Sequence, residues 1–241
     1  MFSKLYFTDN SFTMFSGQHF FTLLLIMVFI YRFVYLDIEK RSDVHYILLG
    51  LALLQQVLLY SWYYASHQFD VVDALPLYPC RLLQLFNIVL LLKDSEKLYE
   101  ILYLLGIPSA IMALIIADTG GNGLPSAMFI QFFLGHTLMI LIPVYIGKKR
   151  QYVIHHQSLG LIAKIMGIYF VVVSLVNQTL NSNYGYLQRP PGELIIHGFP
   201  YRLIYLVGYY LLYLVLVKVW LVVSKILSHK FKKLGLVFGI E

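Results

Sequence analysis

Charged residues and cysteine are both scarce in this chain. Of its 241 residues only 12% are charged, whereas 59% are hydrophobic, and the mean hydropathy is +0.73. Soluble domains carry roughly a quarter charged residues, so this composition excludes a water-soluble globule and predicts a multi-pass membrane protein. The single cysteine, Cys80, excludes an intrachain disulfide and any CxxC metal or redox motif.

The charge that is present does not point to nucleic acid. The formal net charge is +6, and no basic stretch interleaved with aromatic residues lies outside the C-terminal tail. The glycine-rich stretch 118–125 lacks the lysine of a phosphate-binding loop and is expected to be a tight reversal. The sequence therefore predicts no nucleic-acid partner, no metal and no cofactor.

Long apolar runs define the expected fold. At roughly 20 residues per crossing there are about seven of them, and none alternates like a barrel strand, so all are expected to be helices. We predict an all-α, polytopic membrane bundle forming one integral domain over residues 1–241, with a short polar and aromatic N-terminal segment and a basic tail. The apolar runs cover residues 19–36, 44–66, 75–92, 98–117, 126–147, 159–180 and 199–228.

Lysine and arginine fall in every other connection. They occupy the first, third and fifth loops and the tail, whereas the second and fourth loops carry only acidic charge. By the positive-inside rule this places the N-terminus outside and the C-terminus in the cytoplasm. Lys225, Lys230, Lys232 and Lys233 then make the tail a contact for anionic lipid headgroups.

Polar side chains within the apolar runs are the informative residues, because they are costly in a bilayer and tend to face the bundle interior. Cys80, Gln84 and Asn87 are spaced i, i+4 and i+7, so they share one helical face, with Arg81 one position round. Arg81 lies far from the basic loops and needs a partner, for which an anionic headgroup is suited. Further candidates in the predicted outer half are Gln131, His136, Asn177, Asn183, Tyr184 and Arg202.

Each of these residues also has a purely structural interpretation. Amide side chains often join membrane helices by hydrogen bonds, and this alternative stays open for Gln55, Gln56, Gln131 and Gln178. A single membrane histidine can be a satisfied hydrogen-bonding group, and a single cysteine can be an inert small hydrophobe.

Three ordered motifs resemble a known family. LPLYPCR over residues 75–81, QFFLGH over 131–136 followed by PVY over 143–145, and NYGYLQRP over 183–190 are similar to segments of the YwaF-type bacterial integral membrane proteins. Their eukaryotic relatives are the transmembrane protein 164 family. The resemblance implies phospholipid acyl transfer, with Cys80 as nucleophile and His136 as base, in a multi-pass protein of the cell membrane, here a bacterial plasma membrane. Arg81 stands where eukaryotic relatives tend to carry histidine.

The residues themselves suit that chemistry. A thiol of pKa about 8.5 is weakly ionised at neutral pH, so a histidine within reach is needed to take its proton. Gln84, Asn87 and Asn177 are candidate oxyanion or orienting donors. We therefore expect a membrane-embedded acyltransferase acting on lipids from an outward-facing cavity. The alternative is a non-enzymatic lipid or small-molecule binding or transport protein that uses the same cavity and does not need the thiol.

Overall fold

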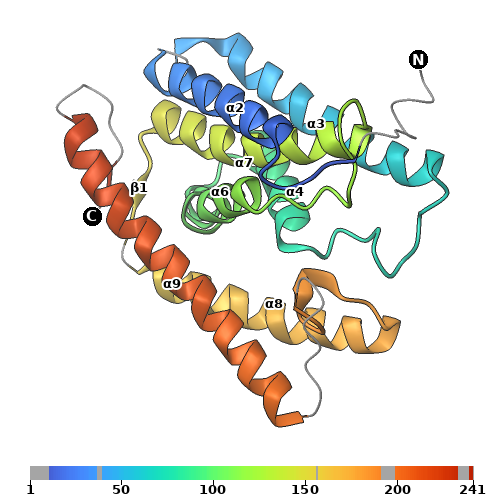
Figure 1. The fold of residues 1–241 in the computed structure, drawn as a ribbon. Helices are drawn as coiled ribbons and strands as arrows, with labels where there is room; N and C mark the ends of the chain where they lie inside the picture. Colours follow the sequence, from blue (N-terminus) through green and yellow to red (C-terminus); the bar gives the residue numbers. More distant parts are fainter. Residues whose placement is uncertain (1–10, 37–39, 156, 191–198, 233–238, 241) are drawn as a thin grey trace.

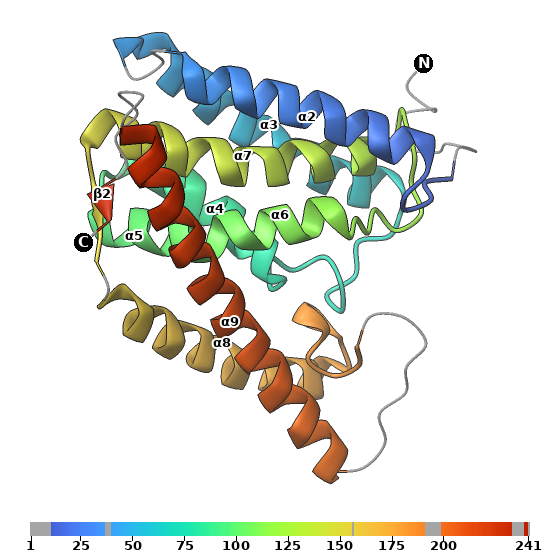
Figure 2. The ribbon, with the colours of Figure 1, turned by 60° about the vertical axis from the view of Figure 1, so that its left-hand side comes forward.

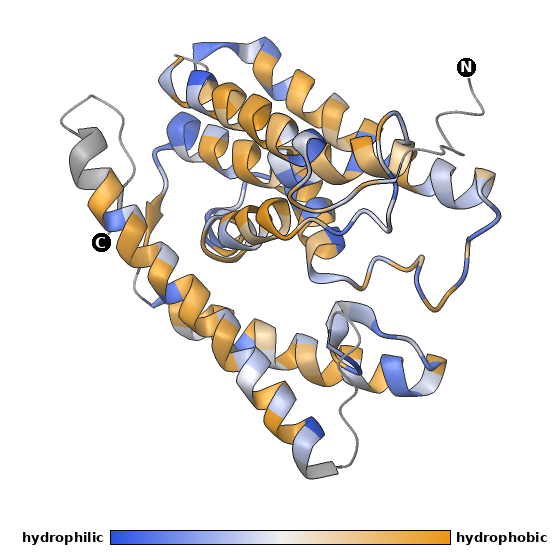
Figure 3. Cartoon of the chain, viewed as in Figure 1, coloured by the Kyte–Doolittle hydropathy of each residue, from blue (hydrophilic) through white to orange (hydrophobic). Residues whose placement is uncertain are grey.

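The computed structural model describes residues 11–36, 40–155, 157–190, 199–232 and 239–240, and helices dominate it. The predicted all-α membrane bundle is confirmed. The only strands in the described part are β1 (Val153–Ile154) and β2 (Gly239–Ile240), which pair in parallel. The long helices are α2 (Gly17–Tyr35), α3 (Ser42–Ala65), α4 (Pro79–Leu92), α7 (Ala127–Arg150), α8 (Ser158–Leu180) and α9 (Phe199–Lys232). Figure 3 shows that their ribbons are mostly hydrophobic.

One further crossing is built from three consecutive helical pieces. These are α5 (Glu96–Ile101), the π-helical segment η2 (Leu102–Gly106) and α6 (Ile107–Ile115). Six helical segments in the described residues, Glu96–Ile115 among them, are long and apolar enough to cross a membrane.

The third predicted span, over residues 75–92, is shorter than the sequence suggested. The apolar run begins at Leu75, but α4 begins at Pro79 and has 14 residues, or about 21 Å of helix. Proline disfavours helical backbone at the residue before it, and Tyr78 is accordingly extended, with ψ 139°. The segment before Pro79 instead folds as turns that cover the start of α4.

Helix α7 forms the centre of the bundle. It packs against α2, α3, α4 and α6, and Figure 1 shows it enclosed by them. Met139, Leu141 and Ile142 are at most 1% exposed. Helices α8 and α9 cross one another beside this group (Figure 2), and most of their residues face outward.

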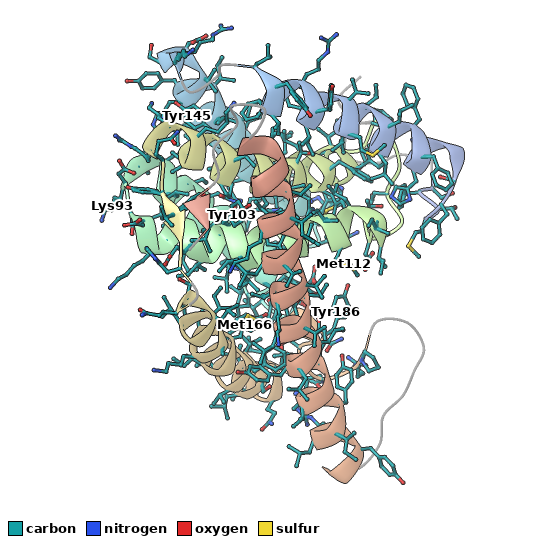
Figure 4. The ribbon with its side chains drawn as sticks, turned by 90° about the vertical axis from the view of Figure 1, so that its left-hand side faces the viewer. Lys93, Tyr103, Met112, Tyr145, Met166 and Tyr186 are labelled. Carbon is teal, nitrogen blue, oxygen red and sulfur yellow. The ribbon has the colours of Figure 1, made fainter. Side chains whose placement is uncertain are left out.

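The basic loops gather at one end of the bundle. The Lys148 ammonium donates to the carbonyls of Val34 (3.0 Å) and Leu36 (2.9 Å), and Arg150 pairs with Asp94 at 2.5 Å. In Figure 4, Lys93 and Tyr145 lie toward this end, and Met112 and Tyr186 lie toward the other. The basic loops, which occupy every other connection along the sequence, therefore lie together at one end of the bundle. That the basic end is cytoplasmic stays a prediction, and Lys233 of the predicted lipid-binding tail lies outside the described residues.

The opposite end is closed by loop contacts. The amide of Phe12 donates to the Gly121 carbonyl at 2.8 Å, and the Tyr186 hydroxyl donates to the Asp118 carboxylate at 2.9 Å. The glycine-rich connection is the tight reversal expected, with Gly120 and Gly121 both at positive φ. The predicted site residues lie between this end and the middle of the bundle.

Candidate functional site

Three glutamines from three helices meet inside the bundle. The side-chain nitrogen of Gln55 on α3 donates to the side-chain oxygens of Gln84 on α4 (3.1 Å) and Gln131 on α7 (2.8 Å). All three are at most 6% exposed. Gln56 donates to the Gln55 oxygen at 2.7 Å. The interhelical joining role left open for Gln55 and Gln131 is what these bonds perform, and Gln84 shares it, whereas the bond from Gln56 stays within α3.

Gly135 allows this meeting. A β-carbon at Gly135 would overlap the side-chain nitrogen of Gln84 and lie 3.2 Å from the Gln55 side-chain carbonyl carbon. Only glycine at residue 135 therefore leaves room for the Gln84 side chain in this position. The contact fixes which turn of α4 faces which turn of α7.

His136 follows Gly135 and is 2% exposed. Its Nδ1 lies 2.7 Å from the Phe132 carbonyl. Since a carbonyl can only accept, Nδ1 carries the proton, and the neutral ring has its lone pair on Nε2. Nε2 is buried and has no hydrogen-bond partner among the described residues. The ring of Phe132 lies 4.3 Å from that of His136 and fixes its orientation.

Cys80 lies at the second position of α4, after Pro79. Its free thiol is half-buried and lies one helical turn from Gln84, at the end of the helix where free backbone amides give a positive potential. Since Gln84 contacts Gly135, about 7 Å of helix rise separates the levels of Cys80 and His136. The positive charge of the neighbouring Arg81 favours the thiolate form of Cys80, against the effect of burial.

Asn87 completes the polar face of α4. It is 1% exposed, and within the described chain neither its side-chain nitrogen nor its oxygen has a hydrogen-bond partner. Unpaired buried polar atoms are destabilising, so atoms of this kind mark a place for water or a ligand. Asn87 and His136 therefore give α4 and α7 three such atoms.

The Arg81 side chain is bound by other residues of the protein. Its guanidinium donates to the carbonyls of Asp73 and Leu75 and to the Tyr63 hydroxyl, and it lies 4.0 Å from the Asp73 carboxylate. Its carbon atom Cζ stands 4.7 Å from the ring centre of Tyr78. Only 14% of the side chain is exposed. Sequence reasoning missed Asp73, although an acidic residue at the same outer end was the available signal.

Asp73 joins this arrangement to the start of α4. It accepts hydrogen bonds from the hydroxyls of Tyr63 and Tyr78. Burial, and then the negative charge of Asp73, raise the pKa of the Tyr78 phenol well above its usual value. Tyr78 therefore stays protonated and remains a donor.

Asn177, in the last turn of α8, and Asn183, after the helix, bind the loop that follows α8. Asn177 accepts from Ser182 and from the Tyr184 amide, both at 2.8 Å, and donates to the Tyr184 carbonyl. Asn183 accepts from the amides of Gln188 and Arg189. These two predicted site residues thus shape the segment containing η3 (Tyr184–Tyr186).

That segment lies against the start of α4. The Tyr184 hydroxyl donates to the Val71 carbonyl and accepts from the Leu75 amide. Gly185 has φ +63°, and a β-carbon there would lie 2.5 Å from the Tyr169 hydroxyl. Tyr169 in turn donates to the Leu77 carbonyl at 2.7 Å. Arg202, in the first turns of α9, has one guanidinium nitrogen without a partner among the described residues.

An open apolar groove runs between α8 and α9. Its volume is about 420 Å³, and Gly167, Phe170 and Tyr210 are among the residues that line it. The Phe170 ring lies 5.6 Å from that of Tyr209 and 6.2 Å from that of Tyr213. Tyr209 and Tyr213 of α9 thus pack against the Phe170 side of the groove. No cluster of three potential metal ligands occurs in the described residues.

These features define a multi-pass helical membrane protein whose interior holds a free thiol, an imidazole and a set of amides. The profile of the TMEM164 family matches residues 7–223, and the chain belongs to that family. The predicted relation to the transmembrane protein 164 family is thereby confirmed. No curated protein and no solved structure matches the chain.

Proposed function

We propose that this protein is a lipid acyltransferase of the cell membrane in which Cys80 is the nucleophile and His136 is the base. The observation that carries the proposal is the buried, unpartnered Nε2 of His136. Its tautomer is set by the bond from Nδ1 to the Phe132 carbonyl, which leaves a lone pair available to take a proton.

The reaction has two half-steps. His136 takes the thiol proton through bridging water, because the two residues lie about 7 Å apart in level. The Cys80 thiolate then attacks the ester carbonyl of a phospholipid. The resulting thioester holds the acyl chain while the departing lysolipid oxygen receives the proton from His136. An acceptor hydroxyl then loses its proton to His136 and attacks the thioester, and Cys80 leaves as thiolate.

The neighbouring residues have supporting roles in this proposal. Asn87, two helical turns beyond Cys80 on α4, offers amide hydrogens without partners that orient the bound lipid. Arg81 orients the first turn of α4 through its hydrogen bonds to Asp73 and Tyr63. Its positive charge stabilises the neighbouring thiolate. The groove between α8 and α9 suits one acyl chain, because it is apolar and faces the lipid.

The groove also favours a second candidate function, which is lipid binding or transport without covalent chemistry. A trapping experiment separates the two. Purified protein in liposomes is incubated with phospholipid carrying a radiolabelled acyl chain, and protein-bound label is measured before and after neutral hydroxylamine. Because Cys80 is the only cysteine, hydroxylamine-sensitive label identifies its thioester. We expect label on the wild type and none on Cys80→Ala. Lipid binding without label on the wild type would refute the enzyme and favour the binding protein.

A further inference from the structure

A polar cavity lies at the basic end of the bundle, remote from Cys80 and from the apolar groove between α8 and α9. Its volume is about 320 Å³, and it opens where the start of α3 meets the ends of α4 and α7. Its polar lining consists of Ser42, His45, Asp94, Lys149 and Arg150.

The charges that line this cavity do not cancel. Asp94 pairs with Arg150 at 2.5 Å and accepts from the Tyr152 hydroxyl at 2.8 Å, so its carboxylate is engaged by these two residues. The Lys149 ammonium bonds to the Tyr145 hydroxyl at 2.9 Å and has no acidic partner among the described residues. A neutral phenol leaves the ammonium charge uncompensated, and the cavity therefore carries one excess positive charge.

Two further features of α3 suit an anion. His45 lines the cavity, and its Nδ1 is buried without a partner in the described part of the chain. Lys149, Arg150 and Asp94 all act electrostatically on this ring. The first turn of α3 has no side-chain cap, and its acidic residue Asp43 is paired with Arg41 at 2.6 Å, so this turn adds no uncompensated negative charge to the cavity.

We propose that this cavity binds a phosphate group. A phosphate offers acceptor oxygens in several directions, which matches donors that come from α3 and α7 together. The lining also includes the apolar side chains of Leu90, Leu91 and Ile146, so the group is carried either by a phospholipid of that leaflet or by a small soluble phosphate. The site is independent of acyl transfer, because it uses no residue near Cys80.

The test measures binding of dioleoyl phosphatidic acid, with dioleoylglycerol as the same molecule without phosphate. Lys149→Gln removes the uncompensated charge and is expected to weaken phosphatidate binding about tenfold, the effect of losing one charge-assisted hydrogen bond. Lys97→Gln is the matched control: it removes the same charge at the same end from an exposed side chain that does not line the cavity. Its binding is expected to equal that of the wild type.

A second variant guards against a loss of folding in Lys149→Gln. Ser42 is exposed at the first position of α3, where a carboxylate stabilises a helix. Ser42→Glu should therefore retain the wild-type unfolding temperature but repel the phosphate and weaken binding to a similar extent.

Glycerol 3-phosphate identifies the source of the phosphate. Competition with phosphatidate at matched concentration indicates a soluble ligand, and its absence indicates a lipid headgroup. Equal binding of phosphatidate by the wild type, Lys149→Gln and Ser42→Glu, or equal binding of phosphatidate and dioleoylglycerol, would overturn the proposal. Cys80→Ala should bind phosphatidate as the wild type does, so failure of the acyltransferase proposal leaves this result unaffected.

Discussion

Gln84 of α4 packs directly onto the backbone of Gly135 in α7, in the space where any other residue would carry its β-carbon. This contact joins the turn that holds Cys80 to the turn that holds His136. The position of the Gln84 side chain, and with it the hydrogen bonds that join α3, α4 and α7, therefore depends on the absence of a β-carbon at residue 135.

Gly135→Ala is expected to destabilise the protein by about 1–3 kcal/mol, because the added methyl group must displace Gln84 or separate the helices. For a chain of this length the apparent midpoint of thermal unfolding should fall by at least about 3 °C. Gly50→Ala is the matched control, since a β-carbon there meets nothing within 4 Å and alanine favours a helix. A similar fall in both variants would contradict the role given to Gly135.

His136→Gln tests the base without emptying the site. Glutamine fills a similar volume and keeps hydrogen-bonding groups, but it cannot take a proton at neutral pH. Acyl transfer should fall by roughly 10²-fold to 10⁴-fold, the usual contribution of a general base. The lipid dissociation constant and the unfolding temperature should change little. A variant that retains more than a tenth of wild-type turnover would exclude His136 as the base.

Arg81 and Asp73 are expected to act as a unit. Arg81→Gln and Asp73→Asn each disturb the same group of hydrogen bonds, which includes Tyr63, so their effects on the free energy of unfolding should not add. We expect a coupling of about 1 kcal/mol in a double-mutant cycle, since Asp73 is 49% exposed and partly screened by solvent. Additive effects would indicate that the two side chains act separately.

Sequence reasoning was most successful where long apolar runs decide the structure. The run 159–180 differs by one residue at its start from α8 (Ser158–Leu180). The sequence-based prediction was wrong about the start of α4. Hydropathy counts Leu75 and Leu77 as apolar, but it does not include the restriction that Pro76 and Pro79 place on the backbone. The interruption of a helix by the π-turn at Leu102–Gly106 also has no counterpart in hydropathy.

Within the candidate site, the shared face of Cys80, Gln84 and Asn87 could be predicted from the sequence, but their partners could not. The spacing i, i+4 and i+7 places the three side chains on one face of α4. It does not reveal that Gln55 bonds to Gln84 and Gln131, because that depends on how three helices turn toward one another. Asp73 was missed as the partner of Arg81 for a similar reason, since the loop before α4 must first fold back over the helix. A glycine inside the apolar helix at position 135 was the one local signal of close packing.

The segregation of charge predicts the topology of the membrane-spanning bundle. The loops that carry the basic residues meet at one end of the bundle, where Arg150 pairs with Asp94 beside the start of α3. By the positive-inside rule this end should face the cytoplasm. A phosphatase fused after Glu241 should be inactive, and the same enzyme inserted in the loop at Gly121 should be active outside. The reverse pattern would overturn the assigned orientation and would put Cys80 nearer the cytoplasmic surface.

The groove between α8 and α9 gives the last prediction. Gly167 lies in its wall, and a β-carbon there meets nothing within 4 Å, so Gly167→Leu fills the groove without disturbing the packing around it. If the groove holds an acyl chain of the substrate, this variant should raise KM for long-chain phospholipids several-fold. The reason is that each methylene group excluded from apolar contact costs about 1 kcal/mol of binding free energy. KM for a short-chain analogue should change little. Gly160→Leu is the control, because Gly160 also has open space around its α-carbon but does not line the groove. An equal effect of the two variants, or no dependence on chain length, would show that the acyl chain binds elsewhere.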